Sequence, residues 1–212
     1  MTAIDTAGLK TMFDAIAVAI EADKDRLCQL DGVIGDADHG IAMVLGFGAV
    51  RDALAALDLS AIEPTALLNT AAKSFLNAVG ASSGPLYATA FMRAAVAVKG
   101  KVTLADADLV AMFQAMAQGI RDRGKAEIGE KTMVDAWQPA AEAAAAAHAA
   151  GKTLAESLEA ALEAAKRGAE ATKDMIAVKG RSSRLGERSL GHIDPGAASA
   201  VTVIGAMRKG LA

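Results

Sequence analysis

Apolar residues recur at steps of three and four along most of the chain, which is the spacing of a helix with one buried face. The pattern is clear from Asp5 to about Leu30, where Leu9, Phe13 and Ile16 follow it. No stretch alternates between apolar and polar residues as a half-buried strand does. Seven further helices are predicted, over residues 40–57, 64–79, 84–100, 106–123, 133–150, 154 to the 170s, and 195–210.

The connections between these predicted helices are short, and short connections favour antiparallel neighbours. The predicted fold class is therefore all-α, with about eight antiparallel helices forming a closed helical barrel or bundle. The length of 212 residues fits one domain spanning residues 1–212. Hydrophobic residues make up 53% of the chain but aromatic residues only 3%. We therefore expect a core built mainly from Ala, Leu, Ile, Val and Met.

Charge and composition exclude several classes of partner. The formal net charge is −3, and no segment concentrates Lys or Arg along one face, so no nucleic-acid partner is predicted. No uncharged apolar run is long enough to span a bilayer, and no secretory signal follows the N-terminus, so no membrane association is predicted. The single cysteine, Cys28, is typical of a reducing compartment, and the expected location is the cytoplasm.

An acidic segment between the first two predicted helices is a candidate metal site. Asp31, Asp36 and Asp38 place three carboxylates within eight residues. Such close like charges repel one another and need a compensating cation, and carboxylate oxygens are preferred ligands of Mg²⁺. A solvated loop with helix-capping aspartates is the alternative, and it is the better interpretation of these residues taken alone.

Three further segments have compositions that suit anion or nucleotide binding. Residues 80–85 are small and precede a helix, so free backbone amides and the hydroxyls of Ser82 and Ser83 can bind a phosphate. Residues 180–197 carry three arginines and four glycines before a helix, and arginine suits phosphate recognition. Residues 124–135 include Met133, which can border a flat apolar ring. Each segment also has a structural interpretation that remains open: plain helix capping for residues 80–85, a structural turn for residues 180–197, and core packing for Met133.

Four motifs follow one another along the chain. They are Gly-Asp-Ala-Asp-His-Gly at 35–40, Ser-Gly-Pro-Leu-Tyr at 83–87, Gly-Glu-Lys-Thr-Met-Val-Asp at 129–135, and Gly-Glu-Arg-Ser-Leu-Gly-His-Ile-Asp-Pro-Gly-Ala at 186–197. In sequence and order they resemble the L subunit of dihydroxyacetone kinases, which is the nucleotide-binding subunit and corresponds to the C-terminal domain of the single-chain kinases. The likeness extends over nearly the whole chain and implies an eight-helix antiparallel barrel with ADP or ATP at one end.

The resemblance also implies a set of site residues. It assigns two Mg²⁺ ions, which bridge the nucleotide phosphates, to Asp31, Asp36 and Asp38. Two departures from the family pattern bear on nucleotide affinity: Ala42 stands where the family usually has Asn, and Ala81 where it often has Gly. The nucleotide contacts implied are His39, Ser82, Ser83, Gly124, Met133, Arg181, Asp194, Pro195, Gly196 and Ala197.

The activity implied is transfer of the γ-phosphoryl group of ATP to dihydroxyacetone, which a separate K subunit holds. Beyond the metal site, no catalytic residue is expected in this chain. The nucleotide is recharged either by a phosphotransferase-system protein or by exchange with free ATP. Two alternatives stay open: a kinase subunit for another short ketose such as a tetrulose, and a nucleotide-binding regulatory protein that contacts a transcription regulator. The fatty-acid kinase branch is disfavoured because His39 stands where that branch typically has Thr.

Overall fold

The computed structural model describes residues 3–80 and 83–211. Within this part of the chain the fold is all-helical, as predicted, and the only strand-like feature is an isolated bridge between Ile4 and Leu104. Two short 3₁₀ segments, η1 (Thr172–Asp174) and η2 (Arg181–Ser189), precede the last helix. The α-helices are α1 (Thr6–Ile34), α2 (His39–Ala55), α3 (Pro64–Ala78), α4 (Ser83–Ala97), α5 (Asp106–Gly124), α6 (Val134–Ala149), α7 (Leu154–Ala171) and α8 (Pro195–Leu211).

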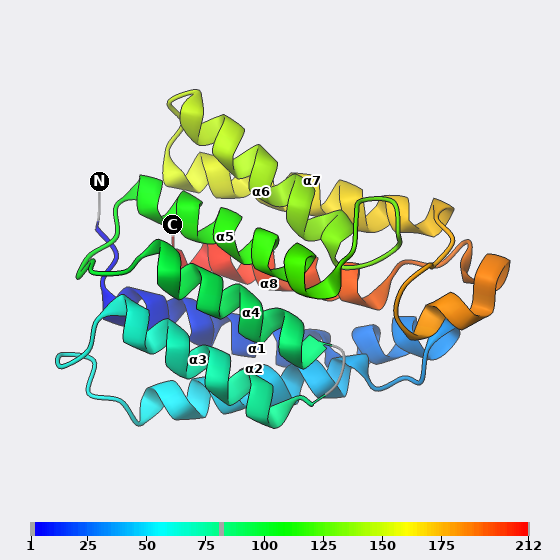
Figure 1. Cartoon of the computed structure of the whole chain (residues 1–212), viewed down its shortest axis with the longest axis horizontal. Coiled ribbons are helices and arrows are strands. Elements are labelled where there is room, and N and C mark those ends of the chain that lie inside the picture. The colour runs from blue at the N-terminus through cyan, green and yellow to red at the C-terminus, as the bar shows by residue number, and fades with distance from the viewer. Residues whose placement is uncertain (1–2, 81–82, 212) are drawn as a thin grey trace.

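The helices form a closed ring. Each one packs against the next in the chain, and α8 returns to pack against α1. Successive helices run in opposite directions (Figure 1). The expected closed antiparallel barrel is therefore confirmed. None of the helices in the described ranges combines the length and hydropathy that a membrane crossing requires.

Local capping explains why most helices begin where the sequence predicts. The Asp5 carboxylate accepts a hydrogen bond from the Gly8 amide at 2.9 Å and starts α1. Pro64 is the first residue of α3, where its missing N–H costs nothing. Thr153 and Glu156 form a reciprocal capping box at the start of α7.

One predicted boundary is wrong in a way that matters for the site. The first helix does not end near Leu30 but continues to Ile34, whose side chain is buried. Burial of the Ile34 side chain outweighs the low helix propensity of Gly32, and the helix ends only at Gly35. Asp31 is consequently fixed in a helical turn rather than in a loop.

The barrel interior is filled by side chains, and the largest of them are aromatic. All seven aromatic residues are at most 1% exposed, and several meet edge to face, including Phe47 and Phe75 with ring centroids 5.0 Å apart. The expectation of a mainly aliphatic core is thus incomplete, because the few aromatic residues all lie in it. The buried aromatic residues are Phe13, Phe47, Phe75, Tyr87, Phe91, Phe113 and Trp137.

A glycine allows the close approach of α7 to the start of α6. A Cβ at Gly168 would overlap the backbone carbonyl oxygen of Asp135. Gly48 on α2 has a very different environment, with open space within 4 Å of an added Cβ. The two helical glycines are therefore a matched pair for separating packing from helix propensity.

We expect Gly168→Ala to lower the free energy of unfolding by about 1–3 kcal/mol, because the backbone of α6 must shift to admit the methyl group. Gly48→Ala should raise it by roughly 0.5–1 kcal/mol, because alanine loses less conformational entropy in a helix. Urea unfolding followed by circular dichroism measures both. A stabilised Gly168→Ala variant would contradict the packing argument.

Candidate functional site

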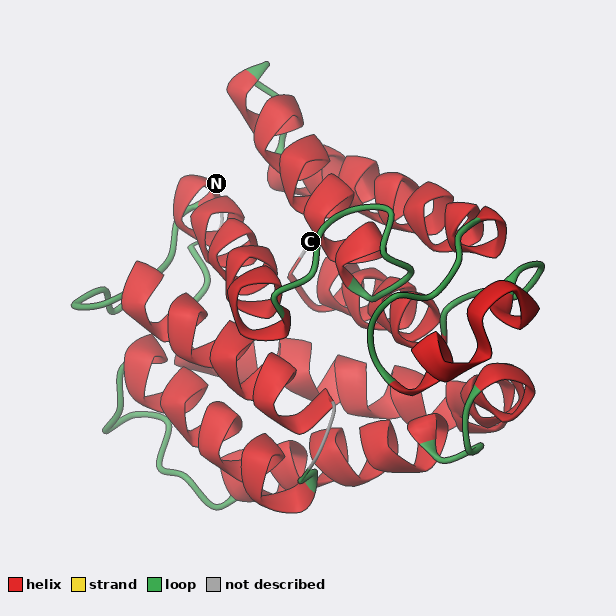
Figure 2. Cartoon of the chain, turned by 45° about the vertical axis from the view of Figure 1, so that its right-hand side comes forward, coloured by secondary structure: helices red, strands yellow, loops and turns green. Residues whose placement is uncertain are grey.

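The antiparallel ring brings every second connection to the same end of the barrel. The connections α1–α2, α3–α4, α5–α6 and α7–α8 all lie at the right-hand end in Figure 1. Figure 2, turned so that this side comes forward, shows them gathered there together with η2. These are the four segments in which the sequence analysis places candidate chemistry.

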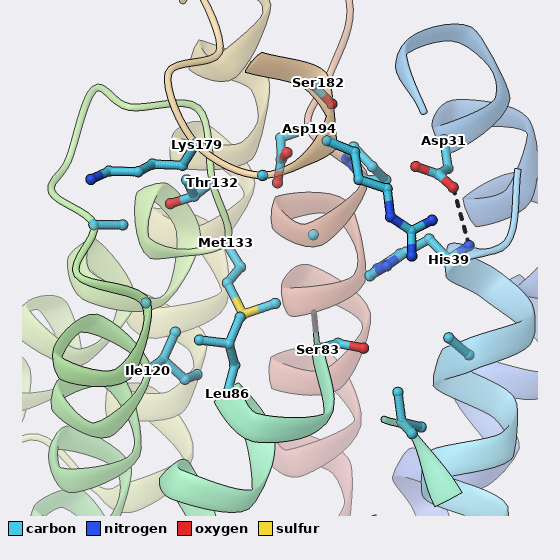
Figure 3. A pocket seen from close by; sticks show the side chains of 18 of the residues that line it. Asp31, His39, Ser83, Leu86, Ile120, Thr132, Met133, Lys179, Ser182 and Asp194 are labelled. Atoms are coloured by element: carbon cyan, nitrogen blue, oxygen red, sulfur yellow. Dashed lines mark hydrogen bonds between the residues drawn. The ribbon is translucent and has the colours of Figure 1, made fainter. Parts of the chain in front are cut away.

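The four connections surround a pocket of about 440 Å³. This volume lies within the range of small-molecule sites, roughly 300–1,000 Å³. Figure 3 shows Asp31 and His39 on one wall, with Met133, Leu86 and Ile120 on the opposite wall. Most of the residues predicted for the site line this pocket: Asp31, Asp38, His39, Ser83, Gly124, Met133, Arg181, Asp194, Pro195 and Gly196.

Among the described residues, two that were predicted for the site, Asp36 and Ala197, do not line the pocket. Asp36 stands beside it, in a cluster with Asp31 and Asp38. Ala197 is fully buried behind the wall, where its amide donates to Asp194. Ser82 lies outside the described residues, as does Ala81.

The three aspartates form a cluster suited to a cation. Each offers a carboxylate oxygen, and these oxygens lie within 4.8 Å of one another. Asp31 is buried, and its Oδ2 accepts hydrogen bonds from the amides of Asp38 at 3.0 Å and His39 at 3.2 Å. These bonds fix the start of α2, so Asp31 both offers a ligand atom and orients the other ligands. The oxygen-only donor set fits Mg²⁺, whose remaining ligands are usually water and phosphate.

Arg181, the first residue of η2, supplies a protein cation to the same cluster. Its guanidinium forms an ion pair with Asp36 and lies 3.0 Å from Asp38 Oδ2. The Arg181 hydrogen bond holds the pKa of the Asp36 carboxyl below its usual range. A metal ion that takes both carboxylates would have to displace the guanidinium, which would leave Arg181 free to bind phosphate oxygens.

Another part of the pocket is apolar. Met133 is 6% exposed and lies on the same wall as Leu86 and Ile120 (Figure 3). Gly124 adjoins this apolar wall, where a Cβ would lie 3.3 Å from Leu86 Cδ2. Met133 therefore belongs both to the core and to the pocket wall. An apolar wall of this kind suits a flat ring.

Sequence reasoning missed Lys131, which joins two of the walls. Its side chain is 1% exposed, and Nζ donates hydrogen bonds to the carbonyl oxygens of Thr172 and His192. Burial lowers the pKa of Lys131, while Asp194, Asp135 and Asp174 act in the opposite direction. The residue was part of a family motif, but nothing local indicated its burial, which depends on contact with a segment 41 residues away. Leu86, Ile120, Lys179 and Ser182 also line the pocket without having been predicted.

Asp194 caps α8 as the sequence predicts, and it also has an unusual acidity. Its Oδ2 accepts a hydrogen bond from the Ala197 amide at 2.8 Å. Desolvation raises the pKa of Asp194 to about 7, with a further contribution from Asp135. The Ala197 amide and the Lys131 ammonium oppose this rise. The Asp194 carboxyl is therefore expected to titrate near neutral pH.

Comparison with known proteins agrees with this fold. A family model for the DAK2 domain matches residues 33–209. The chain belongs to the DAK2 domain family.

Several of its relatives within the family are kinase subunits of similar length. The PEP-dependent dihydroxyacetone kinase, ADP-binding subunit DhaL, of Escherichia coli is 42% identical over 180 residues, which are 84% of this chain and 83% of that protein. The PEP-dependent dihydroxyacetone kinase 1, ADP-binding subunit DhaL, of Listeria innocua is 39% identical over 188 residues, 89% of this chain and 88% of that one. The PTS-dependent counterpart of Lactococcus lactis is 34% identical over 180 residues, 85% and 84% of the two chains.

Two solved structures have the same fold. The native dihydroxyacetone kinase of C. freundii matches with a TM-score of 0.70 and 25% identity, over 95% of this chain and 34% of that one. The complex of the C. freundii kinase with AMP-PNP and Mg²⁺ matches with a TM-score of 0.71 and 23% identity, over 99% and 35%. This chain thus spans about a third of the solved kinase chain.

The acidity of Asp194 predicts a pH-dependent stability. Between about pH 4 and pH 7 the folded chain retains a proton that the unfolded chain releases, so this group's contribution to the free energy of unfolding falls as the pH rises and is constant above about 7. Asp194→Asn can still accept the capping bond but does not titrate. Urea unfolding at a series of pH values should show the wild type losing stability relative to Asp194→Asn between pH 4 and 7. A difference that stays constant with pH would rule out the raised pKa.

Proposed function

We propose that this chain is the nucleotide-binding subunit of a dihydroxyacetone kinase. It carries Mg-ADP or Mg-ATP in the pocket, and the γ-phosphoryl group passes to dihydroxyacetone held on a separate K subunit. The observation that carries the proposal is that the carboxylate cluster, the N-terminus of α4 and the apolar wall of Met133, Leu86 and Ile120 all meet at one pocket. The similarity to ADP-binding subunits over 83–88% of their length supports it.

The residues of the chain suit the needs of phosphoryl transfer, which are positioning and charge neutralisation. Asp31, Asp36 and Asp38 would hold Mg²⁺, which when bound neutralises phosphate charge and orients the γ-phosphoryl group. Two such ions are part of the proposal. The first turn of α4, with the buried Ser83, presents backbone amides to the phosphates. Arg181 adds a forked donor that can follow the phosphate charge.

The opposite wall would hold the base. Met133, Leu86 and Ile120 are apolar and exclude water from the ring that they border. Asp194, Pro195 and Gly196 close the pocket between base and phosphates. His39 lies between Asp38 and this turn, and burial lowers its pKa while Asp31 and Asp38 raise it. No ligand to the sugar substrate is assigned to this chain, because the K subunit binds the ketose.

For the phosphoryl donor we favour a phosphotransferase-system protein that rephosphorylates ADP while it stays bound. The relatives from E. coli and Listeria innocua are named PEP-dependent and the Lactococcus lactis relative PTS-dependent. We expect this reaction to take place in the cytoplasm.

Ala42 lines the pocket where an amide is usual in the family, and its small side chain would lower the affinity for ADP. ADP that dialyses away from the purified subunit would instead favour exchange with free ATP.

A tetrulose is the second candidate substrate. The D-erythrulose kinase and the L-erythrulose 1-kinase of Mycolicibacterium smegmatis are 34% and 35% identical to this chain, which covers 32% and 34% of their lengths. Since the ketose lies on the partner, assays with the K subunit should include both dihydroxyacetone and erythrulose. Firm Mg-nucleotide binding without transfer to either sugar would favour a regulatory protein that contacts a transcription regulator.

The metal assignment predicts that Asp36→Asn loses Mg²⁺-dependent nucleotide binding and lowers phosphoryl transfer by on the order of 100-fold or more, because one charged ligand is missing. The helical fold should survive, since Asp36 is exposed. The measurements are calorimetric titration with Mg-ADP and a coupled assay with the K subunit, dihydroxyacetone and Mg-ATP.

Asp52→Asn is the matched control, because Asp52 is an exposed aspartate on α2 that pairs only with its neighbour Arg51. It should bind Mg-ADP as the wild type does. If Asp36→Asn retains full Mg²⁺-dependent binding and transfer, the carboxylate cluster does not hold the catalytic metal.

A further inference from the structure

Ser199, on the first turns of α8, connects two walls of the pocket. The residue is fully buried. Its Oγ lies 2.9 Å from Nε2 of His39 at the start of α2 and donates to the carbonyl oxygen of Gly196 at 3.0 Å. His39 adjoins the metal ligand Asp38, and Gly196 belongs to the turn that closes the pocket. One hydroxyl group therefore touches both the phosphate side and the α8 side of the site.

The chemistry of these groups sets the direction of both hydrogen bonds. A backbone carbonyl only accepts, so the single hydroxyl proton of Ser199 is directed to Gly196. The Ser199 oxygen can then accept a hydrogen bond from Nε2–H of His39. This contact holds the imidazole by its buried edge. Nδ1 is the ring nitrogen that it leaves available to a ligand in the pocket, into which Figure 3 shows the His39 side chain pointing.

We propose that Ser199 is a positioning residue for the nucleotide and acts through His39. It selects the tautomer with the proton on Nε2 and fixes the ring so that the unprotonated Nδ1 can accept a hydrogen bond from a donor group of the bound nucleotide, such as a ribose hydroxyl. This inference rests on the proposed nucleotide-binding function. Without the Ser199 hydroxyl, the His39 ring can rotate and the link between α8 and the start of α2 is lost.

The chain offers a closely matched control. Ser157 on α7 is also fully buried, and its hydroxyl donates to the carbonyl oxygen of Thr153 at 2.8 Å. Serine to alanine removes the same group from a buried helical position at both sites. Only Ser199 contacts a side chain of the pocket, so the pair separates positioning of the nucleotide from a general loss of stability.

We expect Ser199→Ala to raise the Kd for Mg-ADP about tenfold, the size of one well-placed hydrogen bond, and Ser157→Ala to leave it unchanged. His39→Ala combined with Ser199→Ala should bind about as weakly as His39→Ala alone, because Ser199 acts through the ring. Calorimetric titration measures all four variants, and circular dichroism melting compares the stability of the two serine variants.

A second measurement uses the wild type alone. Long-range ¹H–¹⁵N spectra of the wild type at pH 8 should show the His39 proton on Nε2. Wild-type affinity in Ser199→Ala, additive effects in the double variant, or a proton on Nδ1 in the wild type would each overturn the role of Ser199 while leaving nucleotide binding intact. A wild-type chain that binds no Mg-ADP would overturn the proposed function itself.

Discussion

The site depends on one constraint, the closure of an antiparallel ring of helices. In such a ring every second connection between helices, starting with the one between α1 and α2, lies at the same end of the barrel. The contact between α8 and α1 closes the ring. Four segments that are distant in sequence therefore meet around one pocket. Tight packing sets the precision of that meeting, since the approach of α7 to α6 leaves no room for even a methyl group at Gly168.

Charge within the pocket is divided between the two halves of the chain. The clustered carboxylates come from α1 and the start of α2, whereas the cations Arg181 and Lys131 come from segments after α5. Arg181 is exposed and pairs with Asp36 and Asp38, so it can exchange partners when a metal ion and phosphates enter. Lys131 is buried between fixed carbonyl oxygens and keeps the walls together. Arg181 can therefore change its ion-pair partners, whereas Lys131 keeps the same hydrogen bonds.

The sequence was most informative where structure is local. The apolar spacing predicted where helices begin, and caps that act within one turn, such as Asp5 and Thr153, explain those starts. Spacing alone favoured a capped loop over a metal site for the three aspartates, and the metal site was proposed only from the resemblance to the family motifs. The burial of Lys131 and the contact of Ser199 with His39 could not be predicted, because each arises between segments 40 or more residues apart.

The solvent exposure of the site residues increases from one end of the pocket to the other. Lys131 and Met133 are nearly inaccessible, whereas the side chains of Asp36 and Asp38 are about half exposed. On the proposed function, the base lies at the buried end and the terminal phosphate at the open one. A phosphoryl donor and the K subunit must both reach that terminal phosphate, and two proteins cannot occupy the same opening at once. On the proposed function the two proteins therefore alternate at this opening, with the nucleotide as the carrier between them.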